Sequence, residues 1–325
     1  MKTRIAFLLF FLILSLPLLA QTKRALIIGV GDYPKDSGWE VIHGNKDVWY
    51  VMKYLKKSGY AKNDILSLIN SEATYQGISD AFDTLAQKCN KGDIVYVHFS
   101  GHGAIVRDDD GDEKMADNDD PFDEAWIPYD CKRCAEDSLT LKNAFIDDIV
   151  AAKLTAIRES VGKEGEILVV VDACKAPGST KGVQEADDMT IQNIGISPRS
   201  TMVESDYIYS MAAPEDTNVP KKRFKETPIL IDENNDWYCI YACNKDGASY
   251  ETSDGVGLLV QAIFNVLTNV SVNNAPLHFM NDISRRVINL VTEENNGKEK
   301  RITQIASFSK NCTQEILEKF FGKSK

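Results

Sequence analysis

The chain has 325 residues and a formal net charge of −11, because 48 acidic side chains outnumber 37 basic ones. An acidic surface repels nucleic acid and anionic membranes, so we exclude both as partners. The length is enough for one large α/β domain or two small ones.

The first 20 residues are typical of a secretory signal peptide. Lys2 and Arg4 precede an apolar run over residues 5–20, which is too short to span a bilayer comfortably. A cut before Gln21 would leave residues 21–325, in which no further segment is apolar enough to cross a membrane. We therefore predict a secreted or periplasmic protein, with a retained N-terminal anchor as the alternative.

Buried strands and amphipathic helices alternate along the mature chain. In chain order, we predict a strand over residues 24–30, a helix over 47–57, a strand over 65–69, a helix over 74–88, a strand over 93–100, a helix over 147–159, strands over 167–172 and 237–243, and helices over 256–267 and 313–321.

This order of elements predicts the fold class. Strands that are apolar on both faces, separated by helices, favour a parallel sheet covered on two sides. We predict an α/β fold, a three-layer α/β/α sandwich with a mostly parallel central sheet. A single domain spans residues 21–325, and residues 175–235 form an irregular region within it.

Two chemically active residues follow predicted strands. His102, followed by Gly103, comes after the strand over residues 93–100, and Cys174 comes after the strand over 167–172. Sites in parallel sheets form at the carboxyl ends of the strands, so we expect these two residues to meet there. A thiol becomes a nucleophile when a base favours its thiolate. We predict Cys174 as nucleophile and His102 as base, with the backbone amides of Gly103 and Cys174 facing the oxyanion.

The same motifs resemble the catalytic pair of the caspase-like clan, and in particular metacaspases and their bacterial relatives. HFSGHG at residues 98–103 and VVVDAC at 169–174 carry the resemblance, and similar segments extend over about residues 24–270. The resemblance implies a caspase-haemoglobinase fold and hydrolysis of peptide bonds through a thioester, without an organic cofactor. The chain departs from the family after the cysteine, where residues 175–178 read Lys-Ala-Pro-Gly instead of His-Ser-Gly. A catalytically silent member of the fold that binds peptides is therefore an alternative.

The resemblance also implies a specificity pocket. Asp47, Ser100 and Asp172 correspond to residues that line the pocket for the side chain before the cut. Two carboxylates in such a pocket select Arg or Lys by charge pairing, so we expect peptide or protein substrates with basic residues. Taken alone, Asp47 is also typical of a helix start, and Asp172 of a turn at a strand end.

An acidic loop over residues 107–120 offers oxygen ligands for a hard cation such as Ca²⁺. The resemblance implies calcium dependence, and Asp117, Asp119 and Asp120 are the candidate ligands. A solvated acidic loop is the alternative. A metal-dependent hydrolase that uses His98, His102 and this loop is a further alternative to the cysteine peptidase.

A basic run in the irregular region suits processing by an enzyme that cuts after basic residues. In the family, the region after the cysteine is often cut during activation, and we predict self-processing near this run. An exposed charged loop is the alternative. The run comprises Lys221, Lys222, Arg223 and Lys225.

The chain has seven cysteines. Thiols of exported proteins tend to pair, so we predict that six form disulfides and that Cys174 keeps its thiol. Cys131 and Cys134 have the spacing of half a zinc site, which is the alternative for that pair.

Overall fold

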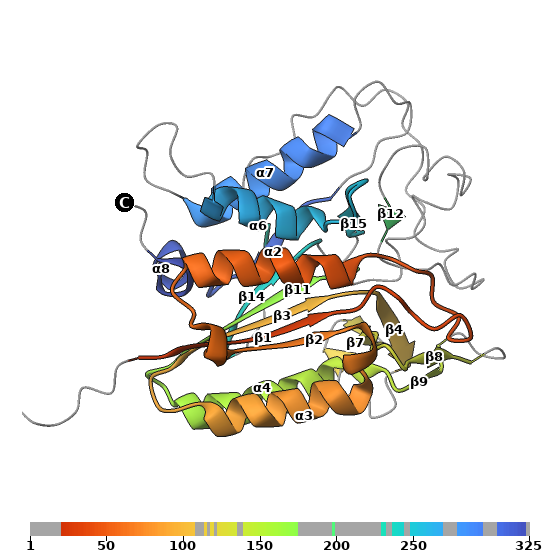
Figure 1. Cartoon of the computed structure of the whole chain (residues 1–325), viewed down its shortest axis with the longest axis horizontal. Helices are drawn as coiled ribbons and strands as arrows, with labels where there is room; N and C mark the ends of the chain where they lie inside the picture. The colour runs from red at the N-terminus through yellow and green to blue at the C-terminus, as the bar shows by residue number, and fades with distance from the viewer. Residues whose placement is uncertain are drawn as a thin grey trace, which may run out of the picture.

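The computed structural model describes residues 21–107, 114–115, 118–119, 122–134, 139–174, 197–198, 229–231, 236–243, 248–268, 278–294 and 304–322. Within these residues a central sheet lies between two layers of helices (Figure 1). The predicted signal peptide and most of the irregular region lie outside them.

The central sheet has seven strands in the order β13-β16-β14-β11-β3-β1-β2. All neighbouring pairs are parallel except β14 and β16. The predicted α/β fold with a mostly parallel sheet is confirmed. The strands are β1 (Lys23–Gly29), β2 (Ile65–Ile69), β3 (Ile94–Ser100), β11 (Glu166–Asp172), β13 (Ile229–Ile231), β14 (Tyr238–Tyr241) and β16 (Ser307–Ser309).

Helices cover both faces of the sheet, which explains why its central strands are apolar on both sides (Figure 1). One face packs against α2 (Gly44–Lys57), α6 (Leu258–Thr268) and α8 (Gln314–Phe321), with α7 (Phe279–Glu294) against α6. The other face packs against α3 (Tyr75–Lys88) and α4 (Asp147–Val161). Of these helices, only α7 was not predicted from the sequence.

Helix α2 begins at Gly44, three residues before its predicted start, and presses against the ends of two strands. A Cβ atom on Gly44 would lie 2.5 Å from the carbonyl oxygen of Ser100 and 2.6 Å from that of Val30. Only a residue without a side chain fits at this distance. The close approach carries the first turn of α2, with Asp47, to the carboxyl end of β3.

A small antiparallel sheet, which was not predicted, continues the chain after β3. Its strands are β4 (Gly103–Arg107), β7 (Phe122–Trp126) and β10 (Phe145–Ile146), in the order β10-β7-β4. The ring of Trp126 stacks on that of Phe99, with centroids 4.8 Å apart, and joins this sheet to the main core. The remaining short pairs are β5 (Lys114–Met115) with β6 (Asn118–Asp119), β8 (Lys132–Arg133) with β9 (Leu141–Lys142), and β12 (Ser197–Pro198) with β15 (Tyr250–Glu251).

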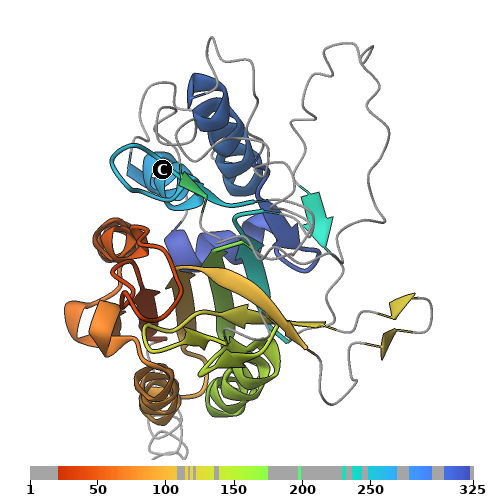
Figure 2. The ribbon, with the colours of Figure 1, turned by 90° about the vertical axis from the view of Figure 1, so that its right-hand side faces the viewer.

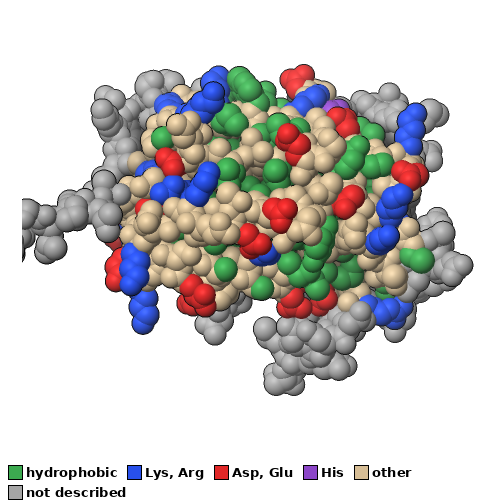
Figure 3. All heavy atoms as spheres, turned by 60° about the horizontal axis from the view of Figure 1, so that its bottom comes forward, with side chains coloured by type: hydrophobic (Ala, Val, Ile, Leu, Met, Phe, Trp, Pro, Cys, Tyr) green, Lys and Arg blue, Asp and Glu red, His purple; other side chains and the backbone are tan. Residues whose placement is uncertain are grey.

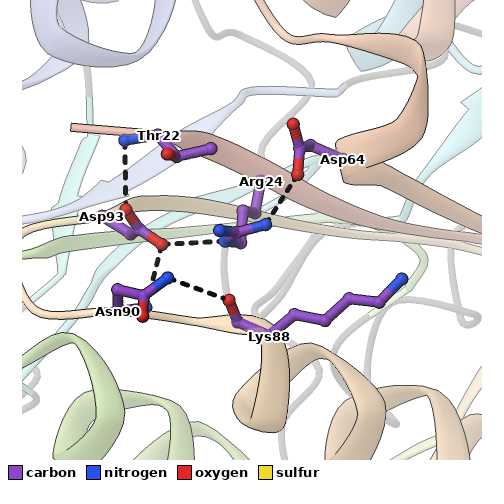
Figure 4. A network of polar contacts seen from close by, with 6 residues as sticks. All are labelled: Thr22, Arg24, Asp64, Lys88, Asn90 and Asp93. Carbon is purple, nitrogen blue, oxygen red and sulfur yellow. Dashed lines mark hydrogen bonds and ion pairs between the residues drawn. The ribbon is translucent and has the colours of Figure 1, made fainter. Parts of the chain in front are cut away.

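A polar network closes the opposite end of the sheet, where the parallel strands begin (Figure 4). Asp93 is 2% exposed and accepts hydrogen bonds from the backbone amides of Thr22 and Asn90, at 3.0 and 2.9 Å. Arg24 donates to Asp93 at 2.8 Å and to Asp64 at 2.6 Å. The network ties the first residues of β1 to the turn that precedes β3.

All seven cysteines lie in the described part of the chain, and each keeps a reduced thiol. The prediction of three disulfides is therefore wrong for this structure. Six of the seven side chains, including Cys174, are buried, and only Cys134 is exposed. Burial rather than pairing accounts for most of these residues, since a buried cysteine packs as a small apolar side chain.

The surface over α3 and α4 carries acidic and basic side chains interspersed with apolar ones (Figure 3). The excess of acidic residues does not gather into one large patch among the described residues on this face. No helix in the described ranges has the length and apolar character needed to cross a bilayer.

Candidate active site

The two predicted catalytic residues leave neighbouring strands at the same edge of the sheet. Ser100 pairs with Asp172 in the register of β3 and β11, and His102 and Cys174 each follow two residues later. A Cβ atom on Gly103 would lie only 1.9 Å from the carbonyl oxygen of Cys174. The segments that carry the histidine and the cysteine are thus in direct contact, at the end of the sheet that faces the viewer in Figure 2.

His102 is 1% exposed and is held in one orientation by the loop that follows β1. Its Nε2 lies 2.8 Å from the carbonyl oxygen of Glu40. A carbonyl only accepts hydrogen bonds, so Nε2 carries a hydrogen and Nδ1 is the basic nitrogen of the neutral ring. The rings of Tyr33 and Trp39 flank the imidazole, with centroids 5.0 and 5.5 Å away. None of these three neighbours was predicted.

The sulfur of Cys174 packs against Ser249, which precedes β15. The backbone amide of Ser249 donates to Sγ at 3.1 Å. A donor directed at sulfur stabilises negative charge there, as a nucleophilic thiolate requires. Ser249 lies in the segment over residues 241–251 that resembles the family, but the sequence alone assigned it no role.

Asp47, Ser100 and Asp172 are each 0% exposed, and all three lie at this edge of the sheet. Asp172 accepts from the hydroxyl of Ser249 at 2.6 Å and from the amide of Val260 at 3.1 Å. Asp47 accepts from the amide of Gly257 at 2.9 Å. Both carboxylates therefore hold the start of α6, where backbone amides attract negative charge.

The two carboxylates also act on a common neighbour, Tyr54 of α2. Burial raises the pKa of its hydroxyl well above the ordinary value, and the charges of Asp47 and Asp172 add to the increase. The two acids and Tyr54 therefore lie close enough to interact electrostatically.

The contact between His43 and Glu251, called the clasp here, joins the histidine side of the site to the cysteine side. Glu251 is 2% exposed, and its carboxylate accepts from the backbone amide of His43 at 3.0 Å and contacts Nδ1 of that residue at 2.6 Å. His43 lies three residues after Glu40, which binds His102, and Glu251 lies two residues after Ser249. The pair therefore links the loop that orients the base to the segment that contacts the nucleophile.

His98 and His102, the two histidines of the metal-dependent alternative, contact different partners. The ring nitrogens of His98 contact Ser100 at 2.7 Å and Tyr96 at 3.3 Å, whereas His102 contacts Glu40. The described residues contain no cluster of three or more side chains suited to a metal.

The remaining candidate residues lie where the structure gives no side-chain contacts. Asp117, Asp120 and the basic run at Lys221–Lys225 are outside the described residues. Asp119 lies on β6, for which only the backbone is described. The calcium site and the processing site stay predictions.

The chain is similar to proteins of a known family. A sequence model of the caspase domain, Peptidase_C14, matches residues 22–316. Metacaspase-7 of Arabidopsis thaliana is 31% identical over 165 residues, which cover 49% of this chain and 36% of the relative. Metacaspase III c of Phaeodactylum tricornutum is 32% identical over 120 residues, which cover 35% of this chain and 34% of the relative. The chain thus spans little more than a third of the length of these relatives.

A solved structure supports the fold. The crystal structure of a protein from Geobacter sulfurreducens superposes with a TM-score of 0.52 and 19% sequence identity. The match covers 90% of this chain and 95% of that one, so the likeness extends across the whole architecture.

Proposed function

The chain belongs to the caspase domain family, and on that basis we propose that it is a cysteine endopeptidase with Cys174 as nucleophile and His102 as base. The direct contact between Gly103 and Cys174, beside an imidazole oriented by Glu40, is the observation that carries the proposal.

The reaction begins with transfer of the thiol proton from Cys174 to Nδ1 of His102. The thiolate attacks the carbonyl carbon of the peptide bond, and the backbone amides of Gly103 and Cys174 stabilise the oxyanion. His102 then protonates the leaving amine, and the peptide bond breaks to leave a thioester. Water, deprotonated by His102, attacks the thioester and releases the acid and the thiol.

The pocket before the cut takes an Arg or Lys side chain. Support comes from the buried carboxylates of Asp47 and Asp172, which lie with the hydroxyl of Ser100 at the same edge as Cys174. Charge pairing in a site removed from water is stronger than at the surface. The amides at the start of α6 hold both carboxylates in place before a substrate enters.

Three further properties belong to the proposal as predictions from the sequence. The protein is secreted or periplasmic after removal of residues 1–20. Calcium binds the acidic loop through Asp117, Asp119 and Asp120 and activates the enzyme. The enzyme processes itself near Lys221–Lys225, so that the Cys174→Ala chain should remain uncut when purified under identical conditions.

Turnover of three reporter peptides tests the function: one ending in Arg, one in Lys and one in Gln before the cleaved bond. We expect the wild type to cleave the first two, Cys174→Ala to cleave none, and Cys134→Ser, at an exposed cysteine, to retain activity. Asp172→Asn should weaken preference for the basic reporters. The assays are run with and without Ca²⁺.

Other outcomes point to the alternatives. Activity that survives Cys174→Ala but is lost to a chelator would favour a metal-dependent hydrolase. Binding of the Arg peptide without turnover would favour a catalytically silent member of the family. Equal cleavage of all three reporters would refute the basic pocket and leave the nucleophile in place.

A further inference from the structure

A row of four polar side chains crosses the core from helix α2 to the predicted specificity pocket. The hydroxyls of Tyr54 and Tyr96 lie 2.5 Å apart. The hydroxyl of Tyr96 lies 3.3 Å from Nδ1 of His98, and Nε2 of His98 lies 2.7 Å from the hydroxyl of Ser100. Each of the four residues is 0% exposed.

Three of these residues come from one strand. Side chains of alternate residues point to the same face, so Tyr96, His98 and Ser100 of β3 all face α2. The cross-strand neighbours of His98 are apolar, Ile27 of β1 and Val170 of β11, whereas Ser100 pairs with Asp172 of β11. The row therefore starts at Tyr54 of α2 and follows β3 from Tyr96 to Ser100.

Burying polar groups in such surroundings costs free energy unless each finds a partner. An apolar residue at position 98 would fill the same layer as Ile27 and Val170 without this cost. The chain instead keeps an imidazole there, with its ring stacked near that of Tyr96 at an interplanar angle of 6°. The proposed catalytic step does not use His98. What the imidazole provides at this position is its hydrogen bond to Ser100.

The hydrogen bonds form a consistent chain in either direction, because a neutral imidazole has one donor and one acceptor. If Nε2 donates to Ser100, Nδ1 accepts from Tyr96, which accepts from Tyr54. If Ser100 donates to Nε2, each of the other bonds reverses. Burial raises the pKa values of both tyrosines, so their hydroxyls keep their protons. In both cases the oxygen of Ser100 retains a lone pair that His98 does not use.

We propose that His98 is a positioning residue that fixes the hydroxyl of Ser100 as an acceptor for the cationic side chain of the substrate, with Tyr96 holding the imidazole from behind. A free serine hydroxyl samples three rotamers, and the bond to Nε2 selects one of them before the substrate arrives. This inference rests on the proposed cleavage after Arg or Lys.

The test uses the full chain and the Arg reporter. His98→Phe removes both nitrogens and should raise KM by roughly tenfold with kcat within about twofold, as expected when one hydrogen bond no longer supports binding. His98→Gln places an amide near the position of Nε2 and should restore part of the loss. Tyr96→Phe leaves His98 in place but removes its hydrogen bond to Tyr96. This variant should also raise KM, by less than His98→Phe does.

A double mutant separates positioning from stability. If His98 acts through Ser100, His98→Phe should leave KM unchanged in the Ser100→Ala background. Tyr60→Phe is the matched control, because the ring of Tyr60 packs edge-on against that of Tyr96 while its buried hydroxyl makes no hydrogen bond to the row. That control should keep the wild-type KM.

The outcomes distinguish this inference from the proposed function. A tenfold effect of His98→Phe that persists in the Ser100→Ala background, or an effect on kcat alone, would overturn the positioning role while the peptidase stands. A wild type that cleaves neither basic reporter would overturn the proposed function, and this inference with it.

Discussion

The backbone of Gly103 lies so close to Cys174 that a Cβ atom on the glycine would be 1.9 Å from the carbonyl oxygen of the cysteine. No real side-chain carbon occupies such a position, so the requirement for glycine is one of space. The contact joins the segment of the base directly to the segment of the nucleophile.

Gly103→Ala should reduce turnover of the Arg reporter by at least about a hundredfold, because one of the two segments must shift by about an ångström. The reporter assay, together with thermal unfolding, measures the effect. Gly59→Ala is the control: its φ of +92° costs stability, but no atom lies within 4 Å of the added carbon. Full activity in Gly103→Ala would show that the contact does not order the site.

Glu251→Ala should lower kcat/KM by about tenfold, because two hydrogen bonds of the clasp to His43 are lost. The comparison is with Lys46→Met, which removes an exposed contact to the carbonyl of Asp254 and should change kcat/KM by less than about twofold. Equal effects of the two variants would argue against a link between the two halves of the site.

Three of the buried cysteines should be alkylated more slowly than Cys174 under native conditions. Burial raises the pKa values of Cys89, Cys131 and Cys312 to about 12 in each case. A raised thiol pKa keeps the neutral form up to higher pH, so these residues hold little thiolate at neutral and mildly alkaline pH. In a Cys134→Ser background, brief treatment with iodoacetamide should therefore label Cys174 first, as peptide mass spectrometry would reveal. Equally fast labelling of Cys89 would contradict this.

Asp93→Ala should lower the free energy of unfolding by about 3 kcal/mol, since it leaves Arg24 and two backbone amides without their buried acceptor. Urea unfolding measures the loss. Asp83→Ala breaks an exposed pair with Lys153 and should cost less than about 1 kcal/mol. If both variants lose the same stability, the network of Figure 4 does not stabilise the sheet.

Much of the main sheet was predictable, because apolar runs and helical periodicity are local properties of the chain. Strand β2 has the predicted bounds, and Thr74 caps α3 as expected by accepting from the amide of Gly77 at 3.0 Å. Strand β16 was missed, since two of its three residues are serines. Ser307 and Ser309 are buried through hydrogen bonds to neighbouring backbone, which no hydrophobic pattern reveals.

The disulfide prediction failed for a related reason. A prediction from the number of cysteines assumes that their side chains come close enough in pairs to form disulfides. Whether they do depends on where each element packs. The fold instead places most of these side chains in its core, one on strand β14 and the others in loops between elements.

The sequence by itself determined which residues emerge at the carboxyl edge of the sheet, because strand length and alternation decide where His102 and Cys174 stand. Only the tertiary structure decided what orients them. The groups responsible are the carbonyl of Glu40, 62 positions from His102, and the amide of Ser249, 75 positions from Cys174. Both groups belong to the backbone, and nearly every residue has the same backbone groups. The sequence therefore does not mark these two, and only the fold brings them to the site.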